Sequence, residues 1–535
     1  MADTHVATVV ARSRAWWLVA ASLIAAFLAR APLYLSVFPP FEGWDEPQHL
    51  AYIVHLDETG TVPVMNESVV PLSLRPLFVG IPQAPPGGQL RDWGALSYDE
   101  YWRTGPPADA SREATFSFRL YQAQHPPLAY ALGVPIWRWL KTPRPLDAIF
   151  ALRLVNVLIA AAGLVLFAAA LERLVPTFGP RVVVLALVCL HPLFFQNVAR
   201  VANDALAVST GLAGISVLAL ANDRTLLTRG LLAAVCIATS VWTKQTSFTL
   251  IPALVVGLPL IGWRHNVLPA RIVRVTCAAV GAFFLLVAPL WVWNYQHYGS
   301  IVTTQDTLEL AARGDVVAAL MRSFSKIAWR PVVANLFVPG QPWVGGWSFL
   351  PIHETLAALH AWIWGIVVTA AGAGAVTALR RAPRIDGGLA VCAAVVVFTT
   401  LGMMYYTVLS HAVFGAPLAN PWYFMTALPF LFVLLVRGLE TISTRLAMTA
   451  GAALAALYVA IELHGTWILM PRAYASTTDV ALQWARLTAI HPAILRGGFR
   501  WLFLAAHVGA LCVVAGALLY TRRRRGTSSV FEERT

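Results

Sequence analysis

Long apolar stretches recur along this chain from Trp16 to Tyr520, and short basic or aromatic segments separate most of them. A helix needs about 20 mostly apolar residues to cross the hydrocarbon core of a bilayer, and most of these stretches come close to that length. The pattern therefore predicts an all-α fold, a polytopic transmembrane helical bundle with about twelve crossings. The expected crossings are 15–37, 150–171, 181–198, 205–221, 229–243, 247–262, 272–295, 356–378, 388–409, 421–437, 446–470 and 499–519.

Lys and Arg gather in the short polar connections between the apolar stretches. Because cytoplasmic loops carry an excess of these residues, the clusters orient the whole bundle. With the crossings given above, both chain ends and every basic cluster fall on the cytoplasmic side. The clusters are Arg12 with Arg14, Arg173 with Arg181, Arg224 with Arg229, and the segments 264–274, 380–384, 437–445 and 522–525.

One segment, 126–140, strains this scheme. It is apolar but short, it contains prolines, and Lys141 and Arg144 follow it. Counting it as a crossing inverts everything downstream and moves the arginines of 380–384 to the outer side. We therefore expect a membrane-embedded or juxtamembrane helix here, with about thirteen crossings as the alternative.

The polar segments divide the chain into six parts. The first large outer loop is rich in Pro, Gly and aromatic residues, and a helix-like stretch runs from Trp44 to Asp57, so we expect a folded cap with juxtamembrane helices. The parts are 1–37 (cytoplasmic N-terminus and first crossing), 38–125 (outer loop with an acidic motif), 126–295 (transmembrane module), 296–355 (second large outer loop), 356–520 (C-terminal crossings) and 521–535 (basic cytoplasmic tail).

Composition excludes a water-soluble globular fold. Hydrophobic residues make up 58% of the chain and charged residues only 12%, whereas soluble domains carry about 25% charged residues. The net charge of +13 and the pI near 9.9 could suggest nucleic acid as a partner. The basic residues lie in loop clusters rather than along one face, so we expect the lipid bilayer as a partner and no nucleic acid.

The most informative polar string follows the first crossing and reads Phe-Glu-Gly-Trp-Asp-Glu-Pro-Gln-His over 41–49. If a helix begins near Asp45, a spacing of four puts Asp45 and His49 on one face, and Pro47 suits the first helical turn. A base and an orienting group could then converge at the membrane surface. Helix capping by acids is the simpler interpretation, and half of a metal site made by Asp45 and His49 is a third.

Further polar strings fall on the predicted outer side. His125 precedes two prolines where the chain re-enters the membrane, Asp204 lies in a very short turn, and Lys244 lies between two tightly spaced apolar helices. Tyr298 closes one helix and Tyr423 opens another. Charges at a membrane edge are costly, which makes Asp204 and Lys244 functional candidates. The simpler interpretations are a helix cap for Asp204, a snorkelling Lys244 and an aromatic interface belt.

In their order along the chain, these strings resemble motifs of the polytopic GT-C glycosyltransferases. That superfamily includes protein O-mannosyltransferases, the aminoarabinose transferase of lipid A and bacterial RgtA/B/C/D-like proteins. The acidic pair Asp45-Glu46 followed by His49 is similar to its first-outer-loop motif, and the His-Pro-Pro-Leu string at 125–128 is similar to its Pro-Pro-Leu motif. The strings Asn203-Asp204, Thr243-Lys244 and Tyr298-Gly299 resemble weaker downstream motifs of that superfamily.

The resemblance implies direct transfer of a sugar from a polyprenyl-phosphate donor to a lipid, glycan or protein acceptor, with inversion at the anomeric carbon. Asp45 then carries over as the catalytic base and Glu46 as the neighbouring acid that shapes the site. Many relatives have an Arg-Tyr pair where this chain has Trp-Tyr at 422–423, so phosphate binding would fall to other cations. The residues expected to bind substrate are His49, Arg119, His125, Arg153, Asp204, Lys244, Tyr298 and Tyr423, among which the cations Arg119, Arg153 and Lys244 could stabilise the phosphate.

No cofactor is firmly expected, and a divalent metal stays an open possibility without an assigned ligand set. We expect the protein in a bacterial inner (plasma) membrane with its active site on the periplasmic or extracellular side. A membrane transporter and a non-catalytic protein that binds lipid-linked sugars are the alternatives of other classes. Within the enzyme class, the alternative is transfer of a whole oligosaccharide from a diphosphate carrier. The most suggestive acids lie in outer loops rather than near the middle of helices, which favours an enzyme over a transporter.

Overall fold

Nearly all regular structure in this computed structural model is α-helical, and the prediction of an all-α polytopic bundle is confirmed. The structure describes residues 2–83, 94–107, 118–142, 144–337, 343–381, 386–418, 420–492 and 499–532. Within these residues, seven helices are long and apolar enough to cross a membrane, or eight if the bent pair Phe178–Leu190 and Pro192–Val198 counts as one crossing. The chain is therefore an integral membrane protein.

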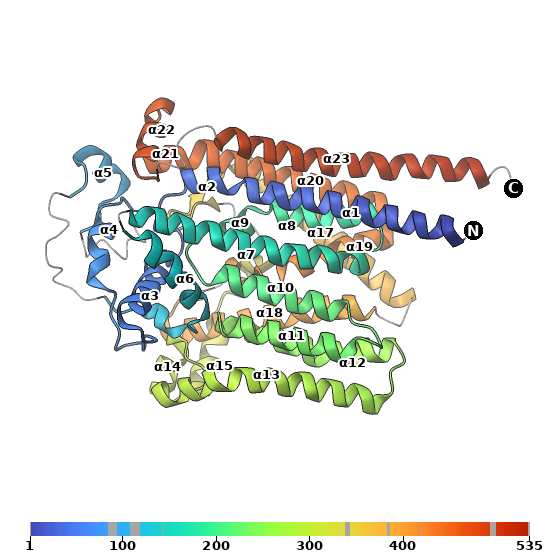
Figure 1. Cartoon of the computed structure of the whole chain (residues 1–535), viewed down its shortest axis with the longest axis horizontal. Coiled ribbons are helices and arrows are strands. Elements are labelled where there is room, and N and C mark those ends of the chain that lie inside the picture. Colours follow the sequence, from blue (N-terminus) through green and yellow to red (C-terminus); the bar gives the residue numbers. More distant parts are fainter. Residues whose placement is uncertain are drawn as a thin grey trace.

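The helices of the membrane bundle lie side by side along the longest axis of the molecule (Figure 1). They are α1 (Ala2–Ala29) with α2 (Ala31–Val37), α7 (Pro145–Leu174), α8 (Phe178–Leu190) with α9 (Pro192–Val198), α10 (Asp204–Ala219), α11 (Leu226–Val241), η4 (Gln245–Leu250) with α12 (Ile251–Arg264), α13 (Pro269–Tyr298), α17 (Glu354–Arg381), α18 (Gly387–Phe414), α19 (Leu428–Ile442), α20 (Thr444–His464) and α23 (Phe499–Glu532). Every expected crossing coincides largely with one of these segments. Because α10, α11 and α19 are shorter than a typical spanning helix, the count of about twelve stays a prediction.

Prolines shift two of the expected crossings. The crossing expected at 181–198 is bent by 53° between α8 and α9, where Pro192 follows His191. The crossing expected at 421–437 begins late, because Pro421–Phe424 forms a separate 3₁₀ turn, η5, and α19 starts only at Leu428.

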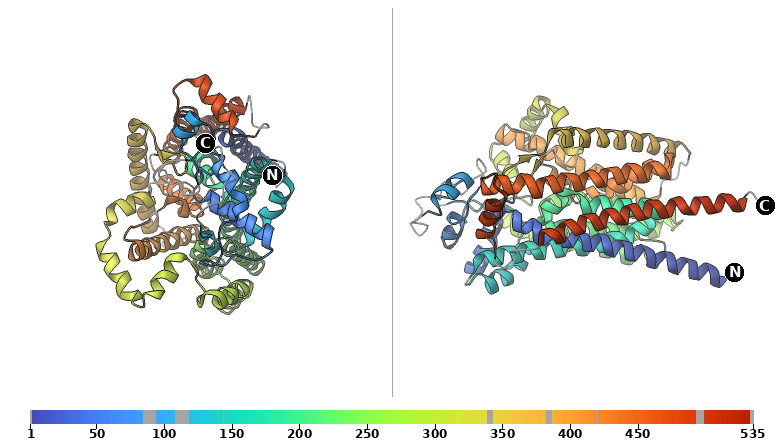
Figure 2. Two further views of the ribbon diagram at one scale, coloured as in Figure 1. Left: turned by 90° about the vertical axis from the view of Figure 1, so that its left-hand side faces the viewer. Right: turned by 90° about the horizontal axis from the view of Figure 1, so that it is seen from above.

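The remaining elements gather at one end of the bundle, whereas the N- and C-terminal ends of the chain lie together at the other end (Figures 1 and 2). They are α3 (Glu46–Thr59), η1 (Leu72–Leu74), α4 (Arg75–Val79), α5 (Tyr98–Thr104), η3 (Tyr121–Gln124), α6 (Leu128–Leu140), α14 (Gln305–Ala312), α15 (Val316–Lys326), α16 (Trp329–Phe337), β1 (Trp343–Val344), β2 (Leu350–Pro351), the π-helical turn η6 (Gly465–Leu469), α21 (Met470–Ala475) and α22 (Val480–Ala489). We call this end of the molecule the outer end, because the basic clusters predict that it lies on the outer side of the membrane.

Labelling of single cysteines tests this orientation. In a background without the native cysteines, Thr104→Cys at the end of α5 should react with a membrane-impermeant thiol reagent in intact cells. Asp223→Cys, in the short connection between α10 and α11, should react only after the membrane is opened, because it lies beside Arg224 and Arg229. Labelling of Asp223→Cys in intact cells would contradict the predicted orientation.

Helix α6 corresponds to the apolar segment 126–140, which did not fit the predicted topology as a full crossing. Its 13 residues span about 20 Å, too little for a hydrocarbon core of about 30 Å. At its C-terminal end, Arg138 and Lys141 donate to Asp57 of α3 at 2.8 Å and 2.6 Å. These ion pairs fasten α6 to the cap formed by the described residues of the first outer loop (38–83, 94–107 and 118–125), as expected for a juxtamembrane helix.

The cap has a hydrophobic core of its own. Leu50, Tyr52, Phe78, Leu120 and Tyr130, from α3, α4, the segment before η3 and α6, are all buried in it. This core is separate from the larger one between the membrane helices. A packed cap can hold α3, and the acidic motif at its start, in a fixed position above the bundle.

Candidate functional site

The acidic motif has a strained backbone. Phe41 and Asp45 both have positive φ values, 68° and 57°, in the left-handed region that favours glycine. Helix α3 begins immediately afterwards at Glu46, with Pro47 in its first turn as predicted. Asp45 occupies the N-cap position, yet its side chain makes no capping hydrogen bond. Helix capping therefore does not explain Asp45, and strain of this kind is characteristic of functional positions.

Glu46 is fully engaged by the protein. Its side chain is buried and binds the guanidinium of Arg153, with Arg153 Nε donating to Oε1 at 2.7 Å and Nη2 to Oε2 at 2.5 Å. The backbone N–H groups of Phe41 and Val201 also donate to Glu46, at 2.9 Å and 2.8 Å. Arg153 in turn donates to the carbonyls of Phe38 and Pro39. This geometry favours a scaffolding role for Glu46 and argues against Arg153 as a phosphate ligand.

Asp45 is in a different situation from its neighbour. Its side chain is half-buried and accepts a hydrogen bond from Tyr121 of η3. Burial raises the pKa of the Asp45 carboxyl above its usual value, although Tyr121 and the positive charges of Arg200 and Lys244 oppose this rise. Among the described residues, no ion pair includes Asp45. A carboxylate of this kind retains lone pairs that can accept a proton.

A buried charge cluster faces Asp45 from the start of α10. The Asp204 carboxylate accepts from Arg200 Nη2 at 2.7 Å and from Lys244 Nζ at 2.6 Å. All three side chains are nearly inaccessible, and Lys244 Nζ also lies 5.2 Å from the ring centre of Tyr423. Asp204, Lys244 and Tyr423 were predicted as site residues, and the fold brings them together. Arg200 was not predicted as a site residue; it lies in the short connection between α9 and α10, four positions before Asp204.

Two histidines line the same region in their neutral form. His49 Nδ1 lies 2.8 Å from the hydroxyl of Tyr130, and its ring is roughly parallel to that of His125 with centres 6.4 Å apart. Burial lowers the pKa of His49 well below its usual value and lowers that of His125 to about 3. Both side chains can therefore orient a ligand through hydrogen bonds but add no charge near neutral pH.

Several buried polar atoms around this site have no partner. These atoms are Gln48 Oε1, Gln122 Oε1, His125 Nδ1 and Asn203 Oδ1. Buried polar atoms are rarely left unpaired in folded proteins.

A cavity of about 360 Å³ opens beside the Asp45 partner Tyr121. Its lining also includes Gln48, Met65 and the exposed side chain of Arg119, whose Nη1 donates to Asn66 Oδ1 at 3.2 Å. The predicted residue Tyr298 lies behind this wall, where its hydroxyl accepts a hydrogen bond from Met65 N at 3.0 Å. Arg119 is thus positioned to meet a ligand, whereas the hydroxyl of Tyr298 is used to hold the wall.

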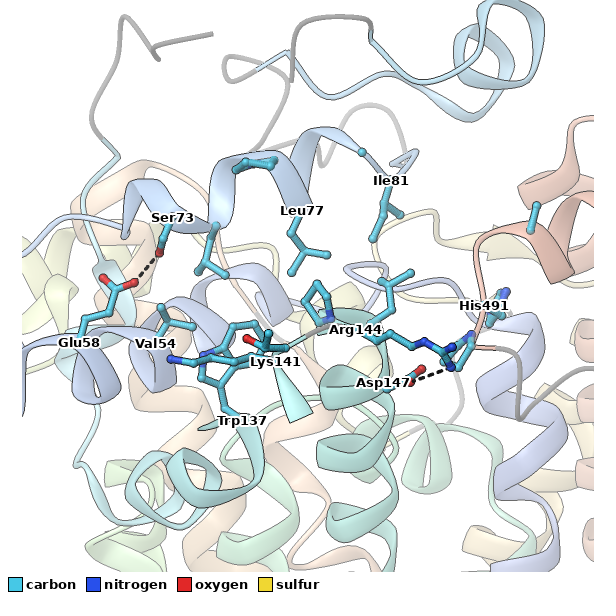
Figure 3. A pocket seen from close by; sticks show the side chains of 18 residues that line it. Val54, Glu58, Ser73, Leu77, Ile81, Trp137, Lys141, Arg144, Asp147 and His491 are labelled. Carbon is cyan, nitrogen blue, oxygen red and sulfur yellow. Dashed lines mark hydrogen bonds and ion pairs between the residues drawn. The ribbon is translucent and has the colours of Figure 1, made fainter. Parts of the chain in front are cut away.

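A larger cavity of about 930 Å³ lies elsewhere, along the C-terminal half of α3 (Figure 3). Glu58 lies at one end of it and His491 at the other, with Lys141 and Arg144 between them. The residues that meet around Asp45 are absent from its lining, so size alone does not identify the candidate site.

In the part of the chain that the structure describes, no group of three or more His, Cys, Asp or Glu side chains could hold a metal ion. In particular, His49 turns its Nδ1 to Tyr130, and nothing adds a third ligand to the half site considered for Asp45 and His49.

No known protein family and no curated protein matches this sequence. Among solved structures, the fold is similar to the apo form of the Archaeoglobus fulgidus oligosaccharyltransferase, with 12% identity over 88% of this chain and 56% of that chain and a TM-score of 0.42. It is also similar to ArnT from Cupriavidus metallidurans, in the apo state (14% identity, 95% of this chain, 77% of that chain, TM-score 0.41) and bound to undecaprenyl phosphate (15%, 88%, 75%, TM-score 0.38). The chain spans little more than half the length of the archaeal protein, and at these identities the similarity concerns the arrangement of helices alone.

Proposed function

We propose that this protein is a glycosyltransferase that moves a sugar from a polyprenyl-phosphate carrier to an acceptor at the outer face of the membrane. The observation that carries the proposal is the Asp45 carboxylate, which is half-buried, held by a strained backbone and close to a cavity. We expect the membrane to be a bacterial inner (plasma) membrane, with the site on its periplasmic or extracellular side.

In the proposed reaction, Asp45 accepts the proton of an acceptor O–H or N–H group while that oxygen or nitrogen attacks the anomeric carbon. The bond from this carbon to the phosphate oxygen breaks on the opposite face, and the phosphate leaves with the electron pair, so this single displacement inverts the configuration. A positioned base contributes about 10² to 10⁴ in rate. The raised pKa of Asp45 suits this task, because a base works best when its pKa approaches the working pH.

Two cations can balance the charge that develops on the phosphate. Lys244 has three N–H donors and uses one of them for Asp204, and Arg119 faces the cavity with an exposed guanidinium. A polyprenyl chain would run along the membrane helices, which brings its phosphate to the outer boundary where both residues lie. Preorganised cations at such a position stabilise a leaving group without reorganisation.

Incubation of the purified protein with a panel of polyprenyl-phosphate sugars tests the proposal. Consumption of one donor, with release of the polyprenyl monophosphate, is the expected result. Release of a diphosphate carrier would instead favour transfer of a whole oligosaccharide. Tight binding of a donor without turnover in the presence of candidate acceptors would favour a non-catalytic binding protein.

Replacement of Lys244 by Met should weaken donor binding while the fold survives. The change keeps most of the apolar side chain, and Asp204 stays paired with Arg200 at 2.7 Å, so no buried carboxylate is left alone. A hydrogen bond to a charged group contributes roughly 1.5 to 3 kcal/mol, which corresponds to a loss of roughly 10- to 100-fold in donor affinity. Binding of a labelled donor to the detergent-solubilised variant measures the effect.

Lys141→Met is the matched control for this experiment. Lys141 also shares a carboxylate with an arginine, because Asp57 accepts from both Lys141 and Arg138, yet it lies at the far end of α3 from Asp45. We expect the Lys141→Met variant to bind the donor with the same affinity as the unmodified protein. If Lys244→Met also binds donor normally, Lys244 serves only to hold Asp204.

A further inference from the structure

Glu42, the third acid of the motif, is used by neither the scaffold around Glu46 nor the proposed chemistry of Asp45. Its side chain is only 1% exposed, and among the described residues no ion pair includes it. A buried carboxylate without a cation is costly, and such a group needs an explanation.

The partners of Glu42 come from the short hairpin that β1 and β2 form, residues 343–351. Ser348 donates to Glu42 Oε1 through its backbone N–H at 2.7 Å and also through its hydroxyl. The backbone N–H of Trp347 donates to the Glu42 carbonyl at 2.9 Å. At Gly346 any Cβ would clash with that carbonyl, so the hairpin approaches as closely as it does only because glycine stands there. One residue of the acidic motif thus holds the hairpin by both its side chain and its backbone.

Two tyrosines complete the cluster from other elements. Tyr98 of α5 donates to Glu42 Oε2 at 2.9 Å, and the hydroxyl of Tyr474 in α21 lies 2.9 Å from that of Ser348. Because a hydroxyl group can accept as well as donate, one of them can take the proton of a neutral Glu42 while the other donors bind its second oxygen.

The hairpin also reaches the residue next to Asp45. The Trp343 ring lies edge-on against Trp44 with centres 5.3 Å apart, and Trp44 stacks on Trp422 at 4.3 Å. Arg200, which binds Asp204, donates to the Trp44 carbonyl. The backbone at Trp44, directly before the strained Asp45, is therefore fixed between the hairpin and the charge cluster.

On these contacts, and on the function proposed above, we propose that Glu42 is a positioning residue for Asp45. It clasps the 343–351 hairpin onto the acidic motif while its carboxyl is protonated, and loss of that proton releases the hairpin. This clasp makes transfer by Asp45 sensitive to pH through a group that does not touch the substrate.

The electrostatic surroundings of Glu42 support this role. Burial raises the pKa of the Glu42 carboxyl to about 7, although the hydrogen bonds from Ser348, Tyr98 and Tyr474 oppose the rise. The titratable groups that face it are Tyr34 of α2, Tyr98 and Tyr474, and tyrosines are neutral below about pH 9. Two cations act on these tyrosines, and both are already paired: Arg153 with Glu46 and Arg30 with Glu462.

The direction in which the clasp changes with pH follows from the difference in the pKa of Glu42 between the clasped and open states. The pKa of Glu42 is about 7 in the clasped state and near the ordinary glutamate value of about 4.3 in an open, solvated state. The stability that the protonated group gives to the clasp is complete below the lower value and is lost as the pH rises through the higher one. Between about pH 5 and pH 7, the clasping equilibrium should fall roughly tenfold per pH unit.

Hydrogen exchange of the Trp347 and Ser348 amides tests the clasp without any substrate. After correction for the intrinsic exchange rate, their protection in the full-length protein should fall as the pH rises from about 5 to 7. Glu42→Gln, which cannot ionise, should keep its protection over the same range. Glu58→Gln is the matched control, because Glu58 is an exposed glutamate that also accepts from a serine, Ser73. Protection that is independent of pH in the unmodified protein overturns the proposal, as does an unchanged pH dependence in Glu42→Gln.

Transfer assays then test whether Glu42 affects the transfer reaction or only holds the hairpin in place. Loss of activity with rising pH should disappear in Glu42→Gln and persist in Glu58→Gln. Ser348→Ala removes a hydrogen bond that lowers the pKa of Glu42, so it should move the midpoint of that loss to higher pH, and it serves as the second variant if Glu42→Gln does not fold. If exchange follows Glu42 but transfer does not, the clasp is structural only. If no variant transfers any sugar, the proposed function fails while the exchange experiment still decides the clasp.

Discussion

Asp45→Asn should reduce the single-turnover rate of sugar transfer by roughly 10²- to 10⁴-fold while leaving folding and donor binding intact. The amide cannot accept the proton of the acceptor, so the chemical step loses its base. Asparagine tolerates the left-handed backbone of position 45 as readily as aspartate does, so the strained turn survives the change. The hydrogen bond from Tyr121 can also persist, because the amide oxygen accepts it.

The measurement needs saturating donor and a single turnover, because slow release of the lipid product could hide a chemical defect. Asp99→Asn, in the first turn of α5, is a control that removes one acid of the cap at an exposed position. In Glu42→Gln, where the loss of activity at higher pH is absent, the rate should rise with pH as Asp45 ionises, and the raised pKa of the Asp45 carboxyl moves this rise above the usual range of aspartate. A near-normal rate in Asp45→Asn would transfer the role of base to another acid, with Asp204 as the next candidate.

The arrangement of helices could be predicted because it depends on local composition. A helix in a membrane needs a run of apolar residues of fixed length, and the sequence shows those runs directly. The basic clusters then indicated which connections share a side, and the first outer loop, the second outer loop and α22 do lie together at one end of the molecule (Figure 1). Membrane crossings thus follow from one-dimensional information.

The division of labour between the two adjacent acids could not be predicted in the same way. Asp45 and Glu46 are equivalent in sequence terms, and what separates them is Arg153, more than 100 positions away. Arg153 was predicted as one of three cations that could stabilise the phosphate, because an arginine at a membrane edge carries no sign of its partner. Only tertiary packing reveals that its donors are used by Glu46 and two carbonyls.

The hairpin at 343–351 and the role of Tyr121 were missed for a related reason. Gly345 and Gly346 are the only local signal in the hairpin, and two glycines in a loop are common. Tyr121 lies in a 3₁₀ turn, and its contact with Asp45 depends on how η3 meets α3. Contacts between distant loops determine the site, and loops carry little periodic information.

Glu46→Gln should show that the second acid supports the fold rather than the chemistry. The pair with Arg153 is completely buried, and removing one partner of a buried pair costs about 3 to 5 kcal/mol because the other charge stays behind without compensation. The thermal unfolding midpoint of the detergent-solubilised variant should fall markedly, and less folded protein should be recovered. The molecules that do fold should transfer sugar at close to the normal rate, in contrast to Asp45→Asn.

Arg144→Met, also near the start of α7, is the control for this comparison. Arg144 pairs with Asp147 at 4.0 Å with its side chain 69% exposed, and such surface pairs contribute about 0 to 1 kcal/mol. Combining Glu46→Leu with Arg153→Met removes both charges and should restore part of the lost stability. Recovery stays incomplete, because the backbone groups of Phe41 and Val201 then lose their acceptor. A Glu46→Gln variant as stable as Arg144→Met, with transfer as slow as in Asp45→Asn, would reverse the roles assigned to the two acids.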